Sequence, residues 1–179
     1  MRTYLFAAAA SIALAACGSS DPDADGDGTI SMAEAAEEAE RSGMTKPEPG
    51  QYRVSMEVLE VDVPGAPPQA VEMMKNMMGG QSSEYCLTPE DVEKGYEEMA
   101  RQSQDGDCSF ERFDAEDGEL DAKMTCDIQG QGTSTMTMTG TTTPTSSQME
   151  MTMQGNIEGM GESTIRMRST HERIGDCAA

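Results

Sequence analysis

Four segments in the second half of the chain alternate between apolar and polar residues. They cover residues 120–128, 136–138, 149–153 and 164–168, and methionine supplies many of the apolar positions. Successive side chains of a β-strand point to opposite faces, so a period of two gives each strand one apolar and one polar face. An antiparallel sheet covered on one side has this pattern. The alternation therefore predicts such a sheet.

The first half of the chain predicts further strands and two helices inserted between them. Residues 51–63 alternate well enough for a long strand, and residues 84–87 form a short one. Residues 69–78 are predicted to be helical, as are residues 89–103, where Thr88 caps a helix that begins with Pro89. The predicted fold class is α+β: an antiparallel meander sheet of about six strands with two inserted helices, preceded by a loop–helix arm.

The N-terminus has the features of an export signal. Arg2 precedes a short apolar run from Leu5 to Ala13, which is too short to span a bilayer. Leu14-Ala15-Ala16-Cys17 resembles the lipobox of bacterial lipoproteins, in which the peptidase cuts before a cysteine that carries a diacylglycerol. A plain secretory signal is the alternative. By analogy with Gram-negative lipoproteins, Gly18 after the cysteine favours the periplasmic side of the outer membrane, with the lipid as membrane anchor.

If Cys17 carries lipid, four of the five cysteines remain for disulfides in an oxidising compartment. Residues 107–114 and 119–128 are predicted to form a hairpin, and a three-residue loop ending at Gly118 places Cys108 opposite Cys126. The remaining pair is then Cys86–Cys177. A metal site is the alternative, but the chain contains no Cys-x-x-Cys spacing and has one histidine, His171.

Residues 23–34 have the spacing of an EF-hand calcium loop, with Gly28 at the sixth position, where the chain must turn sharply. The predicted ligands are the side chains of Asp23, Asp25, Asp27, Ser31 and Glu34 and the carbonyl oxygen of Thr29. No helix enters the loop and no second loop is present to pair with Ile30, so we expect weak affinity, on the order of 10⁻⁴ to 10⁻³ M. A flexible acidic arm is the alternative.

The strongly acidic composition excludes nucleic acid as a partner. The formal net charge is -21, and removing the first 16 of the 179 residues removes Arg2 and leaves a chain of charge -22. Binding to phosphates requires basic surface, which this chain lacks. No nucleophile elbow, phosphate loop or dinucleotide fingerprint is visible, so we expect no enzymatic activity.

The 17 methionines allow three interpretations. The first is that they form the core, because each predicted strand places them on the face that a sheet buries. The second is a Cu(I) site built from thioethers, with Met149, Met151 and Met153 as candidates. The third is a carrier function, in which a deformable methionine-lined face holds an apolar ligand.

Several motifs between Lys46 and Cys177 resemble the bacterial envelope family called domain of unknown function 3617. They are Pro49-Gly50-Gln51-Tyr52, Pro64-Gly65, Tyr85-Cys86-Leu87-Thr88-Pro89-Glu90-Asp91, Cys108-Ser109-Phe110, Met124-Thr125-Cys126 and Arg173-Ile174-Gly175-Asp176-Cys177. The resemblance implies export, often as a lipoprotein, and implies no activity.

The expected organisation is a signal peptide (1–16), a lipid tether (17–22), the calcium loop with its helix (23–45) and a disulfide-linked α+β domain (46–179).

Overall fold

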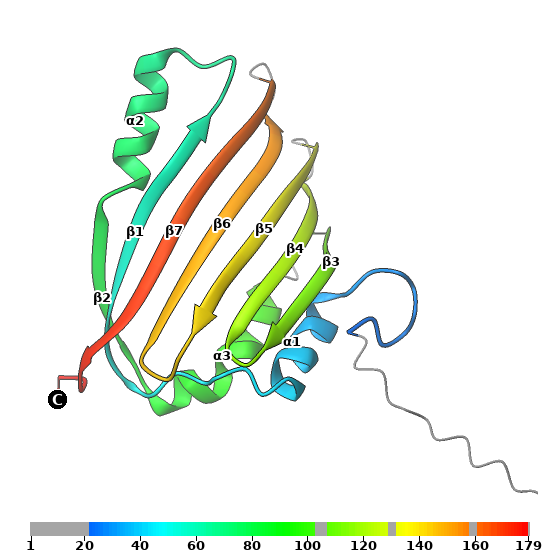
Figure 1. Ribbon diagram of the computed structural model, residues 1–179, viewed down its shortest axis with the longest axis vertical. Coiled ribbons are helices and arrows are strands. Elements are labelled where there is room, and N and C mark those ends of the chain that lie inside the picture. The colour runs from blue at the N-terminus through cyan, green and yellow to red at the C-terminus, as the bar shows by residue number, and fades with distance from the viewer. Residues whose placement is uncertain (1–21, 103–106, 129–131, 158–160, 179) are drawn as a thin grey trace, which may run out of the picture.

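A computed structural model describes residues 22–102, 107–128, 132–157 and 161–178 (Figure 1). In this part of the chain seven strands form one antiparallel sheet in the order β2-β1-β7-β6-β5-β4-β3. The strands are β1 (Gly50–Asp62), β2 (Gln81–Leu87), β3 (Asp107–Glu116), β4 (Glu119–Ile128), β5 (Gly132–Thr142), β6 (Ser146–Ile157) and β7 (Gly161–Gly175). The helices are α1 (Met32–Arg41), α2 (Pro68–Met78) and α3 (Pro89–Gln102).

The predicted α+β class, with an antiparallel sheet and two helices between the first strands, is confirmed, but the sheet has seven strands and not about six. Strand β2 is also longer than the predicted residues 84–87. Its first residues, Gln81 to Ser83, are polar and show no alternation, yet they pair with Met56 to Val54 of β1. These residues join the strand because they pair with β1, and a local sequence pattern does not reveal such pairing.

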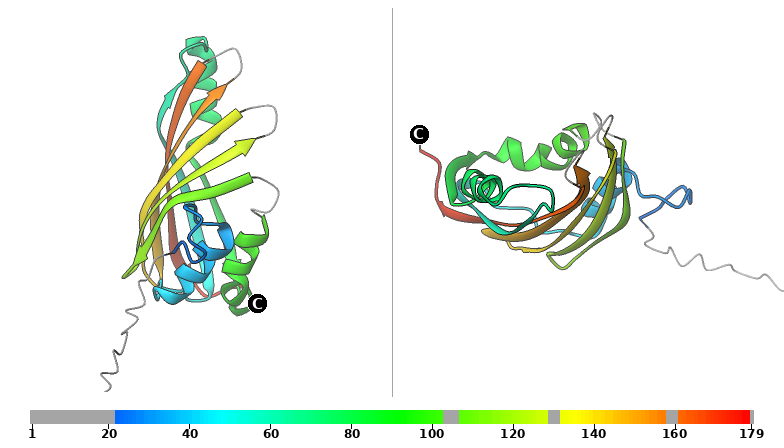
Figure 2. Two further views of the ribbon diagram at one scale, coloured as in Figure 1. Left: turned by 90° about the vertical axis from the view of Figure 1, so that its right-hand side faces the viewer. Right: turned by 90° about the horizontal axis from the view of Figure 1, so that it is seen from above.

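The sheet is curved, and the helices lie on its concave side (Figure 2). Helix α1 packs against this face, because Ala35 belongs to one core cluster with Phe110 and Ala122. The strand register aligns the apolar residues of this face into rows that cross the sheet. Two of these rows are Phe110–Met124–Met136–Met153–Ile165–Val61 and Phe113–Ala122–Met138–Met151–Met167–Val58.

Burial along these rows is uneven. Phe110 and Ala122, at the end covered by α1, are 4% and 0% exposed, and Val61 at the other end is 8% exposed. Met153, in the middle of the sheet, is 36% exposed. This face of the sheet is therefore most buried beside α1 and partly exposed at its centre.

The hairpin between β3 and β4 confirms the predicted pairing of Cys108 with Cys126 but reaches it by a different turn. Only Asp117 and Gly118 lie between the strands, with φ of 51° and 81°. Two successive residues with positive φ are typical of a tight two-residue hairpin turn, and glycine favours this backbone region. A β-bulge between Phe110 and Arg112 adds one residue to β3 and restores the register expected from a three-residue loop.

Both predicted disulfides are present. The bond between Cys108 and Cys126 joins directly paired residues of β3 and β4, whose Cα atoms are 4.0 Å apart. The bond between Cys86 and Cys177 joins β2 to the segment after β7, with a Cα–Cα distance of 5.4 Å. Since β1 lies between β2 and β7, this second bond ties together both neighbours of β1.

The opposite face of the central strands carries a network of ion pairs. Arg168 of β7 contacts Glu57 of β1 at 3.2 Å and Glu150 of β6 at 2.5 Å. Arg166 contacts Glu60 at 3.4 Å and the same Glu150 at 3.8 Å. The hydrogen bond from Arg168 lowers the pKa of the Glu150 carboxyl below its usual value. Alternating polar residues therefore link three strands across this face.

Candidate functional site: an acidic loop paired with the sheet edge

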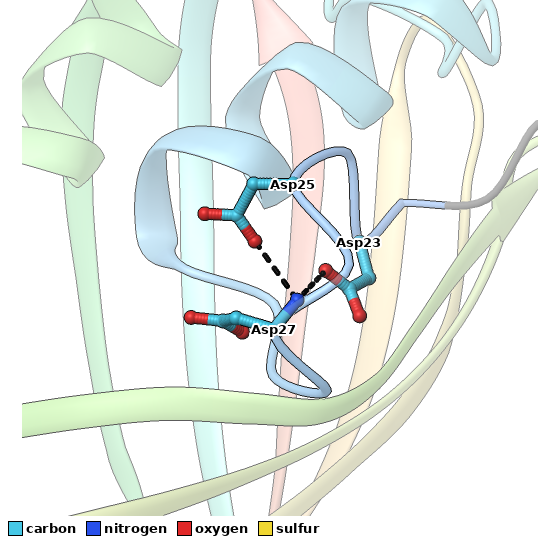
Figure 3. A group of neighbouring side chains, drawn as sticks. All are labelled: Asp23, Asp25 and Asp27. Atoms are coloured by element: carbon cyan, nitrogen blue, oxygen red, sulfur yellow. Dashed lines mark hydrogen bonds between the residues drawn. The ribbon is translucent and has the colours of Figure 1, made fainter.

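The structure brings together three of the predicted calcium ligands. Single carboxylate oxygens of Asp23, Asp25 and Asp27 all lie within 4.8 Å of one another (Figure 3). The chain that carries them turns at Gly28, whose φ is 90°. A side chain would be strained in this backbone region, which explains glycine at the sixth position of the loop.

Backbone amides of the loop hold these carboxylates in place. Asp23 accepts hydrogen bonds from the N–H groups of Gly26 at 2.8 Å and Asp27 at 3.2 Å through Oδ1, and from Gly28 at 2.9 Å through Oδ2. The N–H of Asp27 is also bonded to Asp25 Oδ1 at 3.1 Å (Figure 3). Amides that converge in this way place partial positive charge between the carboxylates and offset their repulsion. Backbone amides thus hold the three aspartates in one cluster.

Glu34, the predicted ligand at the twelfth position, is directed at both ends of the loop. Its Oε2 accepts from the N–H of Ser31 at 2.8 Å, and its Oε1 accepts from Ala24 at 3.0 Å and Asp25 at 3.4 Å. The Ser31 hydroxyl accepts in return from the N–H of Glu34 at 3.3 Å, which completes a capping box at the start of α1. The bond from Ser31 N–H is the largest cause of a lowered pKa of Glu34. Among the described residues, the group of carboxylates within 4.8 Å of one another contains the three aspartates and not Glu34.

The two remaining predicted ligands occupy the second half of the loop. Thr29 donates to Asp27 Oδ1 with both its N–H and its hydroxyl, each at 2.8 Å. Ser31 is the N-cap of α1. All six predicted ligand residues thus lie in one continuous segment that runs from the loop into the first turn of α1. Oxygen donors of this kind suit a hard divalent cation such as calcium.

Ile30, at the eighth loop position, has a partner that the sequence did not indicate. Its N–H donates to the carbonyl oxygen of Phe110 at 2.9 Å, and the N–H of Phe110 donates to the carbonyl oxygen of Ile30 at 2.8 Å. Phe110 belongs to β3, an edge strand of the sheet. The acidic loop therefore pairs with the edge strand and caps it at this point.

Both residues of this pair are also buried: Ile30 is 6% and Phe110 is 4% exposed. They share a core cluster with Ala35 of α1, and Phe113 and Met124 pack against it. The acidic loop is thus attached to the sheet by backbone and by side chains. The sequence signal for this attachment was a large apolar residue, Ile30, inside a mostly polar loop.

His171 packs between neighbours on the sheet. Its Nδ1 lies 3.2 Å from the Tyr85 hydroxyl and its Nε2 lies 3.0 Å from Ser169 Oγ. Burial lowers the pKa of this histidine. These contacts show that His171 is packed against its neighbours.

Other predicted features remain predictions. The signal sequence and Cys17 lie outside the described residues. Within those residues, no helix is both long enough and apolar enough to cross a membrane. The candidate copper ligands Met149, Met151 and Met153 lie on one face of β6, and Met151 and Met153 belong to the rows described above. Copper bound by the purified protein, and lost when all three become leucine, would support that alternative.

Comparison with protein families identifies the main part of the chain. Residues 47–177 match the model of the family described as "Protein of unknown function (DUF3617)". The match covers all seven strands together with α2 and α3, and it begins after the acidic loop and α1. The curated proteins and the solved structures gave no match. The chain therefore belongs to the DUF3617 family, whose function is unknown.

Proposed function

We propose that this protein is a lipid-anchored component of the bacterial cell envelope whose acidic loop binds calcium and thereby orders the edge of the sheet. The observation that carries the proposal is the pair of hydrogen bonds between Ile30 and Phe110. It connects a loop with EF-hand spacing to the domain of the DUF3617 family. A cation that orders the loop would therefore also stabilise β3 and α1.

The calcium ligands would be the six residues predicted from the spacing: Asp23, Asp25, Asp27, Thr29, Ser31 and Glu34. The ion would relieve the repulsion between the three aspartates. Glu34 would bind through its two carboxylate oxygens, which also accept hydrogen bonds from three backbone amides. With a single loop and no entering helix, the expected affinity is in the weak range of extracellular calcium modules.

Calorimetry of the mature protein carrying Cys17→Ser tests the calcium proposal. We expect one site with a Kd on the order of 10⁻⁴ to 10⁻³ M. The double variant Asp25→Asn/Asp27→Asn removes two ligands and should abolish the heat. Asp62→Asn/Asp114→Asn removes the same charge from exposed positions of β1 and β3 and should leave it unchanged. If the unsubstituted loop gives no heat up to several millimolar calcium, the loop is only an acidic arm.

Hydrogen exchange followed by NMR tests the connection between loop and sheet. Calcium should slow exchange at the amides of Ile30 and Phe110, because both donate in the bridge. The amide of Val54, at the distant β1–β2 pair, is the internal reference. Calcium binding with no change at Phe110 would separate the loop from the sheet and refute the ordering role.

A further inference from the structure

A cavity of about 280 Å³ lies between α1 and the concave face of the sheet. Strands β3, β4, β5 and β6 supply one wall and α1 with the residue Met44 supplies the other. All of its described lining residues are apolar: Met32, Ala35, Ala36, Ala39, Met44, Phe110, Phe113, Leu120, Met124, Met138 and Met149. Its volume is close to the lower end of small-molecule sites, roughly 300 Å³, and exceeds a dry cavity of about 150 Å³ that accepts benzene.

The cavity exists because α1 presents alanines to the sheet. Ala35 and Ala39 are one helical turn apart and are 4% and 3% exposed, so they form the buried stripe of this helix. A helix that packs on a sheet usually fills such positions with larger side chains, since protein interiors are packed to nearly crystalline density. Here the space that larger residues would take is left open.

The chemistry of the lining selects the ligand. The described wall offers no hydroxyl, amide or charged side chain, and its methionine sulfurs are only weak acceptors, so a polar group placed inside would lose most of its hydrogen-bond energy. Five of the lining residues are methionines, which are unbranched and adapt their shape to a neighbour. We infer that this cavity binds the hydrocarbon chain of a single-chain lipid, such as a fatty acid, with its polar end outside the cavity. This site does not depend on the calcium proposal.

Binding of cis-parinaric acid, a naturally fluorescent fatty acid, tests the inference. The mature protein with Cys17→Ser is used so that no lipid attached to the chain can occupy the cavity. We expect the fluorescence of the probe to rise on binding, and palmitate to displace it more effectively than octanoate because the longer chain buries more apolar surface. No fluorescence change up to the solubility of the probe would overturn the inference.

A matched pair of alanine substitutions locates the binding. Ala36→Leu adds volume to the wall of the cavity, whereas Ala33→Leu adds the same volume at an exposed position of the same helix. Filling the cavity should weaken binding at least about tenfold, and the exposed change should leave it unaltered. Thermal unfolding of both variants verifies that they are folded. Equal affinities in two folded variants would place the probe elsewhere and refute this site.

If Ala36→Leu fails to fold, Met138→Leu at the sheet wall replaces it. Leucine is similar in size to methionine but branched and stiffer, so the cavity should discriminate more strongly between straight and branched chains. If Met138→Leu distinguishes straight from branched chains no better than the unsubstituted protein does, the sheet wall has no role in binding. The titration with cis-parinaric acid is repeated once with calcium and once with chelator. Probe binding in a protein that binds no calcium would refute the calcium proposal and leave the lipid-binding inference intact.

Discussion

Ile30 and Phe110 exchange both of their backbone hydrogen bonds and are both almost completely buried. One residue belongs to a loop that precedes the family domain, and the other belongs to the edge strand of that domain. The loop is therefore a structural part of the domain to which it is attached. Changes in the loop should consequently be detected in the stability of the whole sheet.

The side chain of Ile30 is expected to contribute strongly to stability. Ile30→Ala removes buried methyl groups next to Phe110 and should lower the free energy of unfolding by about 2–5 kcal/mol. Ile174→Ala is the matched control, because Ile174 is 39% exposed and should change stability much less. Urea unfolding followed by circular dichroism measures both. Equal small effects would mean that the loop does not pack on β3.

The two disulfides should differ in their effect on stability. Cys86–Cys177 closes a loop with a sequence separation of 91, against 18 for Cys108–Cys126. The chain-entropy model then gives the longer loop about 1.4 kcal/mol more stabilisation. Cys86→Ser/Cys177→Ser should therefore unfold at lower denaturant than Cys108→Ser/Cys126→Ser. The reverse order would show that local contacts at the β3–β4 hairpin outweigh loop closure.

Stability should fall at acidic pH through the polar face of the sheet. Arg168 lowers the pKa of Glu150 below its usual 4.5. A carboxyl with a lowered pKa in the folded state stabilises the protein above about pH 4.5, and this contribution is lost as the pH falls through the lowered value. Glu150→Gln should flatten the dependence of the unfolding midpoint on pH below 4.5. An unchanged slope of the unfolding midpoint against pH would show that Glu150 does not contribute to the loss of stability. Glu40→Gln on α1 is the control and should leave this slope unchanged.

The proposed membrane anchor would depend on one sulfur atom, that of Cys17. Cys17→Ser should release the protein from the membrane fraction into the soluble periplasmic fraction, because no diacylglycerol can be attached at serine. Metabolic labelling with a radioactive fatty acid should mark the unsubstituted protein and not the variant. Labelling that persists in the variant would place the lipid elsewhere, and a soluble, unlabelled parent protein would support a plain secretory signal.

Local patterns predicted the individual elements well. The alternation of Leu120, Ala122 and Met124 correctly indicated β4 and the face that it buries. The pairing of Cys108 with Cys126 also followed from short-range geometry, because a hairpin limits the available registers. The turn itself was predicted wrongly, since the bulge after Phe110 shifts the register by one residue and a local pattern does not distinguish that shift from a longer loop.

The sequence by itself determined the one-sided sheet, the Cys108–Cys126 disulfide and the expected ligands of the acidic loop, because strand alternation, hairpin register and loop spacing are all short-range properties. The Cys86–Cys177 disulfide, with a sequence separation of 91, followed only by elimination. Tertiary structure alone decided that Ile30 pairs with Phe110 and that the alanines of α1 leave a cavity against the sheet. Both features join segments far apart in the chain. Their geometry depends on how the curved sheet and α1 pack together, and no local pattern of residues specifies that packing.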